Sequence, residues 1–509
     1  METLRELVQL ITRKRIKKVE LFDEQSRGKN SNYYRLFEGI HNYKYQNDQE
    51  AAQDIYQCEP SAKKYLILKT RLKQKLLNTL FFLDTENQDH LSPREVAFYD
   101  CNRTLYHANV LILNNAIEIA APMIEKNLKK AQEFHLTQIE YECARIMARF
   151  HHEQQNYRDF VMYRNLCERL EQRRLAEDRA ERLYQEVVST YHKSKANRHN
   201  ALKLAHQHRL TVLADWQKFK STAIETHLLK IQTFEKQLQN DYPEVLQLLN
   251  KHERLLVLHK SHCAPAQLME MQLAKMNVHV LLRHFAEGQQ YAQQLDNFTE
   301  GTLPWYQLQV LSILLALHSG QYEAAAQVFK VVLEQASFRN LDNLDKTKWL
   351  AFQAYLHYLY RSDKRREIRP LIQNTKLNFK LSEFVDDRPP FEKERRGLNI
   401  SILAIQALYY LERHDTLGVG DCIQALLPYC RRYPKKDEYF RSECFINLLQ
   451  LMQQENFRFY HTRKATEKIA QEMENTPMEA QTHNLFLEIM PFEQIWERMM
   501  EKLKEIKYS

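Results

Sequence analysis

The stretch that decides the fold is residues 305–335, WYQLQVLSILLALHSGQYEAAAQVFKVVLEQ. Two apolar segments flank a short Ser-Gly-Gln turn. In the second segment, apolar residues recur at steps of three, four and three: Tyr322, Ala325, Phe329 and Val332. This spacing places them on one face of an α-helix, and that face must be buried. The stretch therefore predicts two helices that pack against each other across a short turn.

The same stretch resembles a tetratricopeptide (TPR) unit, a helix-turn-helix of about 34 residues. Four residues take positions of the TPR pattern: Gly320 in the turn, Tyr322 at the start of the second helix, Ala325 where the helices approach closely, and Phe329 in the groove. Poorer matches run through residues 283–295 and 156–170. The resemblance implies an α-α superhelix, a TPR-like solenoid of antiparallel helix pairs with a concave binding surface.

The first helix of this unit departs from one group of TPR proteins. Units that clamp a peptide carboxylate carry Lys and Asn there, whereas this chain has Gln307, Val310, Leu314, Leu317 and His318. Such a surface is too apolar to hold a charged terminus. Either it packs against neighbouring helices, or these residues other than Leu317 face an apolar segment of a partner.

Glycine is scarce along the whole chain, with eight residues in 509, where average usage would give about 35. Strands joined by tight turns, Rossmann crossovers and P-loops all depend on glycine. Leu, Gln, Glu, Lys, Arg and Ala dominate instead, and all of them favour helices. The composition therefore predicts an all-α protein and argues against the glycine-rich nucleotide-binding folds.

Motifs of catalysis, metal binding and membrane insertion are missing from the sequence. No GxSxG, GxxxxGK[ST], GxGxxG or HExxH occurs. The longest apolar run has eight residues, and a membrane-spanning helix needs about twenty. The eight cysteines are scattered without a CxxC pair, as expected of reduced thiols. We therefore expect a cytoplasmic protein with no enzymatic activity, cofactor, metal, membrane segment or small-molecule substrate.

Changes in composition and helix signals predict three parts. A basic helical module covers residues 1–84, where 16 Lys and Arg stand against 11 Asp and Glu. The tetrapeptide SPRE at residues 92–95 opens a new helix with an N-cap, a first-turn proline and a capping glutamate. TPR-like repeats fill residues 92–384, and C-terminal repeats with a capping helix fill residues 397–509. A charged loop around Pro389-Pro390 separates these two parts.

The basic residues of the N-terminal module (residues 1–84) point to nucleic acid. Residues 48–56, the turn at 58–60 and the helix from Ser61 loosely resemble a helix-turn-helix. The candidate contacts lie in two runs: Arg13, Lys14, Arg15, Lys17, Lys18, Lys63, Lys64, Lys69, Arg71 and Lys73. Against this hypothesis, the turn lacks glycine, and the basic residues of 63–75 spread around their helix, as on a solvated capping module.

Two functional hypotheses follow. The first is a non-enzymatic scaffold or adaptor whose TPR-like superhelix binds a protein partner on its concave surface. The alternative is a transcriptional or other nucleic-acid-binding regulator, in which residues 1–84 contact nucleic acid and a TPR-like domain acts as the sensor.

Overall fold

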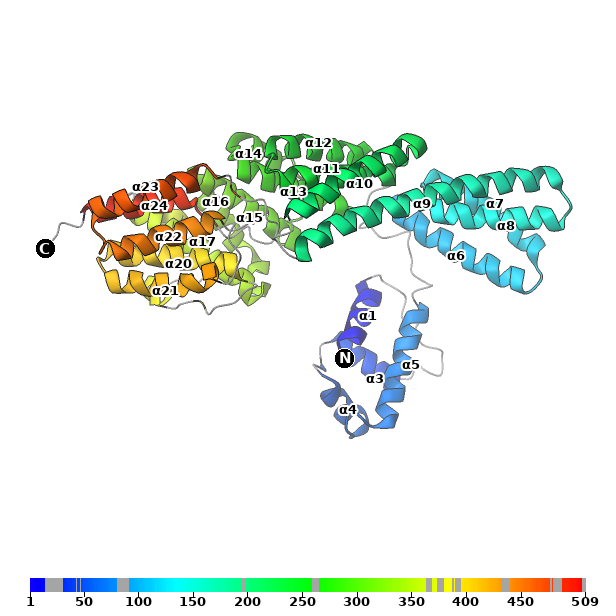
Figure 1. The fold of residues 1–509 in the computed structure, drawn as a ribbon. Helices are drawn as coiled ribbons and strands as arrows, with labels where there is room; N and C mark the ends of the chain where they lie inside the picture. The colour runs from blue at the N-terminus through cyan, green and yellow to red at the C-terminus, as the bar shows by residue number, and fades with distance from the viewer. Residues whose placement is uncertain are drawn as a thin grey trace. The chain divides into compact units, whose positions relative to one another are not determined.

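The computed structural model describes residues 1–13, 31–42, 44, 45, 47–79, 91–193, 198–258, 265–362, 369–372, 380–386, 389, 395–431, 440–476, 478 and 488–505. These residues contain 23 α-helices, a short 3-10 helix and no strand, which confirms the all-α prediction (Figure 1). Two compact units divide the chain: residues 1–174 with 259–265, and residues 175–258 with 266–509.

Four helices of the N-terminal module enclose a core of their own: α1 (Glu2–Arg13), α3 (Asn32–His41), α4 (Asp48–Tyr56) and α5 (Lys63–Thr79). Apolar residues at helical spacing turn one face of α5 into this core: Tyr65, Leu68, Leu72 and Leu76. Asp48 of α4 accepts hydrogen bonds from the Tyr65 hydroxyl and the Lys69 ammonium group, each at 2.8 Å. An apolar face and one ion pair therefore hold α5 against α4.

Further helices of the first unit pack in sequence order: α6 (Pro93–Leu113), α7 (Ile117–Glu133) and α8 (Thr137–Glu153). The first half of α9 (Tyr157–Lys193) adds Tyr163 and Leu170 to the same core. α6 begins as predicted, because the Ser92 hydroxyl accepts from the Glu95 amide and the Glu95 carboxylate accepts from the Ser92 amide. Small side chains between these helices let them approach closely: Ala97, Cys101, Ala108, Ala120, Ala131, Cys143 and Ala144.

The turns between helices share one backbone geometry in both units. In eight of them, one residue just past the helix has positive φ, and the next amide donates to the carbonyl five residues earlier, as in a Schellman motif. The residues at positive φ are Asn115, His135, Gln155, Asn240, Arg283, Gly320, His414 and Asn456. Only one of these eight is glycine, and the left-handed conformation costs other residues roughly 1–2 kcal/mol. Scarce glycine therefore does not prevent short helix-turn-helix connections.

The second unit begins within α9, and most of its helices pack against their neighbours in sequence. They are α10 (Arg198–Phe219), α11 (Thr222–Leu238), α12 (Tyr242–Leu258), α13 (Pro265–Leu282), α14 (Phe285–Gln293), α15 (Leu303–His318), α16 (Tyr322–Glu334), η5 (Ala336–Asn340), α17 (Asn343–Ser362), α18 (Arg369–Ile372), α19 (Leu381–Asp386), α20 (Arg396–Glu412), α21 (Thr416–Arg431), α22 (Phe440–Gln454), α23 (Phe459–Glu474) and α24 (Phe492–Glu505).

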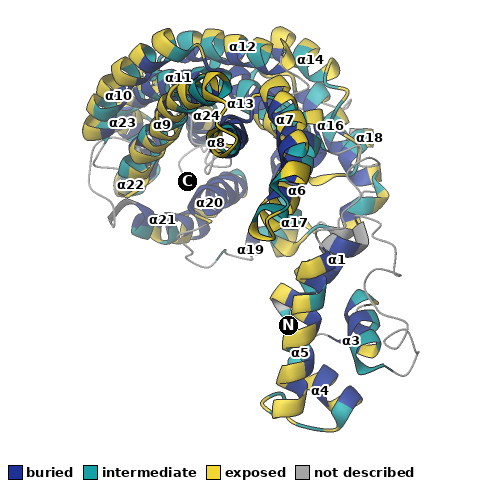
Figure 2. Ribbon diagram, turned by 90° about the vertical axis from the view of Figure 1, so that its right-hand side faces the viewer, coloured by how far each residue is buried: buried dark blue, intermediate teal, exposed yellow. Residues whose placement is uncertain are grey.

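α20 is buried on all sides, unlike a helix in a regular row of helix pairs. Every residue from Arg396 to Leu411 is buried, and Figure 2 draws this helix almost wholly in dark blue. α17, α21 and α24 all pack against it. α24 also contacts α22 and α23. The C-terminal helices therefore form a bundle around α20.

An ion network holds the segment before α24 in place. The side chain of Arg441 is 3% exposed and donates to both carboxylate oxygens of Glu488 at 2.8 Å. It also donates to Glu493 and to the carbonyl oxygens of Met473 and Thr476. Each N–H of the guanidinium thus has an acceptor, which is what a buried charge requires.

Residues 305–335 form the predicted helix pair, α15 and α16, joined by a turn with Gly320 at a φ of +72°. Tyr322, Ala325 and Phe329 are buried, as the spacing of this face requires. A regular superhelix and the three predicted domains remain predictions. Residues 85–90 and much of the 385–397 loop lie outside the described residues.

Candidate binding cavity

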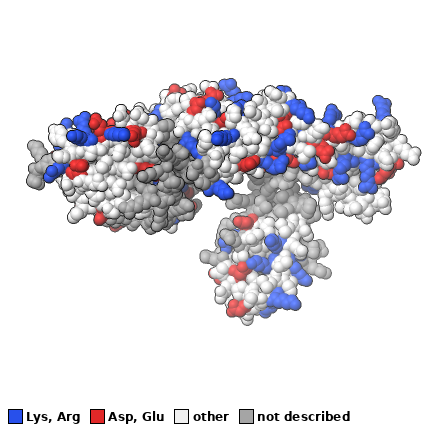
Figure 3. Space-filling model, in the orientation of Figure 1, with Lys and Arg blue, Asp and Glu red and all other residues white. Residues whose placement is uncertain are grey.

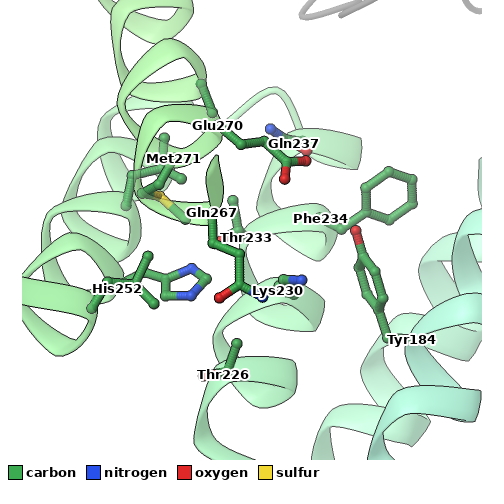
Figure 4. A pocket seen from close by; sticks show the side chains of 13 residues that line it. Tyr184, Thr226, Lys230, Thr233, Phe234, Gln237, His252, Gln267, Glu270 and Met271 are labelled. Atoms are coloured by element: carbon green, nitrogen blue, oxygen red, sulfur yellow. The ribbon is translucent and has the colours of Figure 1, made fainter. Parts of the chain in front are cut away.

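A cavity of about 160 Å³, here named the α11 cavity, lies among α9, α11, α12 and α13 of the second unit (Figure 4). It is lined by Tyr184, Thr226, Lys230, Thr233, Phe234, Gln237, Leu249, His252, Leu256, Gln267, Glu270, Met271 and Ala274. At roughly 30 Å³ for each water molecule, the cavity holds about five waters. It is therefore large enough for a side chain or a small organic group.

Two faces of α11 meet other parts of the second unit: one enters an apolar core, and the other forms a wall of the cavity. Ile224, Leu228 and Ile231 enter the apolar core shared with α9 and α10. A second face carries the cavity residues at steps of four, three and four: Thr226, Lys230, Thr233 and Gln237. Residues three and four apart are neighbours on a helix, so these side chains form one row.

Two buried polar atoms in the lining have no hydrogen-bond partner among the described residues. They are Nε2 of His252, which is 2% exposed, and Oγ1 of Thr233, which is 7% exposed. In folded proteins the large majority of buried polar side-chain atoms have a partner, and an unsatisfied one is unfavourable by about 1–3 kcal/mol. Two such atoms in one cavity therefore indicate a bound water or ligand.

Lys230 is the only lysine or arginine among the described residues that line the cavity. No carboxylate lies within ion-pair distance of it in the described part of the chain, and its Nζ is 5.6 Å from the centroid of the Tyr184 ring. Burial and, after it, the charge of Lys230 lower the pKa of His227 and of His252 from 6.5 to about 4. Both imidazoles are therefore neutral at pH 7, and Lys230 is the cation of the cavity.

The negative charge in the lining, Glu270, lies away from Lys230 and His252. In Figure 4, Lys230 and His252 extend into the same space from α11 and α12, whereas Glu270 on α13 lies near Gln237. Glu270 is exposed and belongs to the rim. Burial and then the Glu270 charge raise the pKa of Tyr184, so its hydroxyl stays protonated. The α11–α12 side of the cavity is thus rich in hydrogen-bond donors.

Three of the four candidate partner-facing residues on α15 are not on the surface. Val310, Leu314 and His318 are 9%, 1% and 5% exposed, and His318 Nε2 lies 2.6 Å from the carbonyl oxygen of Glu488. The chain's own core covers them, because α15 packs against α14 and α16 and the segment before α24 reaches its end. Of the four, Gln307 is exposed. α15 therefore offers little surface to a partner in this structure.

The candidate nucleic-acid contacts of α5 differ in their surroundings. Lys63, Arg71 and Lys73 are exposed. Lys64 donates to a backbone carbonyl at 2.9 Å, and Lys69 forms an ion pair with Asp48. Three of the five basic residues predicted on this helix are therefore exposed, with no ion pair to another described residue.

The remaining basic candidates fall where the structure does not describe side chains: Arg13, Lys14, Arg15, Lys17 and Lys18. The exposed surface of α5 also carries Leu66 and Ile67, which are 47% and 40% exposed. Figure 3 shows Lys and Arg mixed with Asp and Glu over the face in view. The described basic residues on this face therefore form no unbroken stripe.

Lys230, Thr233 and His252 were not predicted as site residues from the sequence. The step of three between Lys230 and Thr233 places them on one helix face, but it does not say what that face meets. The neighbouring His252-Glu253 dipeptide lacks the continuation of a zinc-binding motif. Only the packing of α12 against α11 shows that the three side chains share a cavity.

Comparisons with known proteins give no family. No protein-family model matches the chain, and no curated protein and no solved structure matches it either. Among the described residues, no group of three or more His, Cys, Asp or Glu is placed to hold a metal ion. The described helices include none that is long and apolar enough to cross a membrane. The function must therefore be argued from the fold and the α11 cavity.

Proposed function

We propose that this chain is a non-enzymatic binding protein, a scaffold whose helix pairs form a TPR-like superhelix around a protein partner. In this proposal the α11 cavity receives one group of that partner. The observation that carries it is the lining of the cavity: it includes a lysine with no carboxylate at ion-pair distance and two buried polar atoms with no hydrogen-bond partner among the described residues.

The succession of helix pairs supports a binding role. Eight connections use the same short turn, which is compatible with a succession of similar helix pairs although the sequence repeats poorly. Stacked helix pairs create extended surfaces, and such surfaces commonly bind other macromolecules. This part of the proposal rests on architecture and on the resemblance of residues 305–335 to a TPR unit.

The chemistry of the α11 cavity favours binding over catalysis. Nucleophilic catalysis needs a base hydrogen-bonded to a nucleophile, and often a third group that orients the base. His252 Nε2 has no hydrogen bond to a hydroxyl or thiol of the described residues. Its imidazole is neutral at pH 7 and can form a hydrogen bond with a ligand.

Site-specific photocrosslinking tests the proposal. A photoreactive amino acid is placed at Gln267, which is on the exposed rim of the cavity, and in a control at Tyr460, which is 78% exposed on α23. After irradiation in the native source, we expect a discrete protein adduct at Gln267 and none at Tyr460. Absence of any protein adduct at Gln267, with the labelled chain folded and expressed, would refute the proposed scaffold role of this surface.

The N-terminal module supports an alternative function, that of a nucleic-acid-binding regulator. The N-terminal module has a separate core, and its α5 exposes Lys63, Arg71 and Lys73. Such residues bind phosphates by releasing counterions, which makes affinity depend steeply on salt.

A salt series with the full chain and duplex DNA tests that alternative. Each phosphate contact contributes about 0.9 to the slope of log affinity against log salt. Replacing Lys63, Arg71 and Lys73 together by alanine should therefore lower the slope by about 2 to 3 if all three meet phosphates. A slope near zero for the unaltered chain excludes the regulator.

A further inference from the structure

The α11–α12 side of the cavity holds more hydrogen-bond donors than acceptors. Lys230 brings three N–H groups, Thr233 a hydroxyl, and His252 a neutral ring in which one nitrogen carries a proton. Thr233 Oγ1 and His252 Nε2 have no partner in the described part of the chain. An occupant of this region must therefore accept several hydrogen bonds at once.

Charge narrows the choice of occupant. A water molecule accepts hydrogen bonds but leaves the ammonium group of Lys230 without a counterion inside a partly buried cavity. Burial is the main cause of the lowered pKa of His227 and of His252, and the charge of Lys230, which adds to it, also attracts an anion. A carboxylate supplies about four lone-pair sites on two oxygens, which suits the three donor side chains together.

The rest of the lining specifies what carries the carboxylate. Leu249, Leu256, Met271 and Ala274 are apolar, and the cavity volume of about 160 Å³ limits the apolar part to a short stem. Glu270 at the rim repels a second negative charge. The lining therefore favours a monocarboxylate over a dicarboxylate of the same length.

We propose that the α11 cavity binds a carboxylate on a short apolar stem, with Lys230 as its counterion and with Thr233 and His252 as hydrogen-bond donors. The inference rests on the proposed binding function and specifies the chemistry of the same cavity. Two sources carry such a group: a free short-chain organic acid, and the end of a polypeptide whose last residue is apolar.

Calorimetric titration of the full chain at pH 7 and low salt tests the inference. The probes are butyrate, its neutral isostere butyramide, and the dicarboxylate succinate. We expect butyrate to bind at least about tenfold more tightly than butyramide, because only butyrate forms charge-assisted hydrogen bonds with Lys230. Succinate should bind more weakly than butyrate. Equal affinities for butyrate and butyramide, or no binding of butyrate, overturn the inference.

Variants locate the binding. Lys230→Met keeps the aliphatic stem and should weaken butyrate binding about tenfold or more, whereas Lys251→Met, at an exposed position of α12, should leave it unchanged. Thr233→Val should weaken binding and yet raise the thermal stability of the ligand-free protein, since it removes an unsatisfied hydroxyl. Unchanged butyrate binding by Lys230→Met contradicts the inference even if Thr233→Val behaves as expected.

Two further peptide probes separate the sources. N-acetyl-Gly-Leu is titrated with a free and with an amidated C-terminus. Preference for the free peptide over butyrate assigns the ligand to a chain terminus, and binding of butyrate alone assigns it to a free acid. Carboxylate binding without a protein adduct at Gln267 means that the scaffold role fails while the cavity chemistry stands. A protein adduct at Gln267 without carboxylate binding means that the cavity chemistry fails while the scaffold role stands.

Discussion

Acid should loosen the second unit around the α11 cavity, because His227 and His252 must be neutral in the folded state. Burial, and then Lys230, lower the pKa of both imidazoles from 6.5 to about 4. The unfolded chain therefore binds more protons than the folded one between pH 6.5 and 4. The stability that these residues contribute is complete above pH 6.5 and is lost as the pH falls toward 4.

The size of the effect follows from the two pKa values. Between pH 7.5 and pH 5.5, a pKa of 6.5 in the unfolded chain and about 4 in the folded chain corresponds to a loss of about 1.3 kcal/mol for each histidine. The pair together loses about 2.6 kcal/mol, a large part of the 5–15 kcal/mol that stabilises a typical domain. Among the described residues that line the cavity, the other titratable groups are Lys230 on α11, Glu270 on α13 and Tyr184 on α9.

Hydrogen exchange of α11 and α12 is the appropriate assay, because a chain with two units need not unfold in one step. After correction for the intrinsic exchange rate, the free energy of opening is compared at pH 7.5 and pH 5.5. It should fall by about 2.6 kcal/mol more in the unaltered chain than in His227→Gln/His252→Gln. The control His461→Gln removes an imidazole that is 63% exposed and should leave the pH dependence unchanged. An identical pH dependence in the double variant and the unaltered chain would refute the reasoning.

Three further predictions concern the fold. Arg441→Met should weaken the protection of α22 and α24 from exchange by about 3–5 kcal/mol, since it leaves the buried carboxylate of Glu488 without a counterion. Adding Glu488→Gln should restore part of the protection. A loss below about 1 kcal/mol for Arg441→Met contradicts the prediction. Gln155 has a φ of +57°, so Gln155→Gly removes backbone strain and should stabilise α8 and α9 by about 1 kcal/mol. The control Gln154→Gly, at a φ of −81°, should give no gain in the same exchange experiment. Gly39→Ala would place a Cβ 2.0 Å from Cε2 of the buried Tyr45, so the N-terminal module should lose about 1–3 kcal/mol of stability. Unchanged hydrogen exchange of α3 to α5 would contradict this prediction and show that the Tyr45 ring moves freely.

Local patterns in the sequence predict the parts of this fold that depend on neighbouring residues. The three- and four-residue spacing in 322–332 fixes the buried face of α16, and the SPRE tetrapeptide fixes the start of α6, because both effects act within a few turns of one helix. The positive-φ turns were not predictable in the same way. Residues such as Gln155 and Arg283 hold positions that favour glycine, and the Schellman hydrogen bonds and the packing of the next helix keep them there.

Features built from distant segments escape sequence reasoning. His318 is buried, and its imidazole lies against the backbone carbonyl of Glu488, 170 residues later in the chain. The α11 cavity draws Tyr184, Lys230, His252 and Glu270 from four helices. None of these residues stands in a recognisable motif, and only the packing of α9, α11, α12 and α13 brings them together.

The most direct test of the account is the pKa of the His252 imidazole, measured by NMR with and without saturating butyrate. A carboxylate that accepts a hydrogen bond from this ring favours its protonated form, so binding should raise the pKa from about 4 toward 6.5. Butyramide at the same concentration should leave it unchanged. A His252 pKa that does not respond to butyrate would contradict the account, because the ligand would then not contact the α11 cavity.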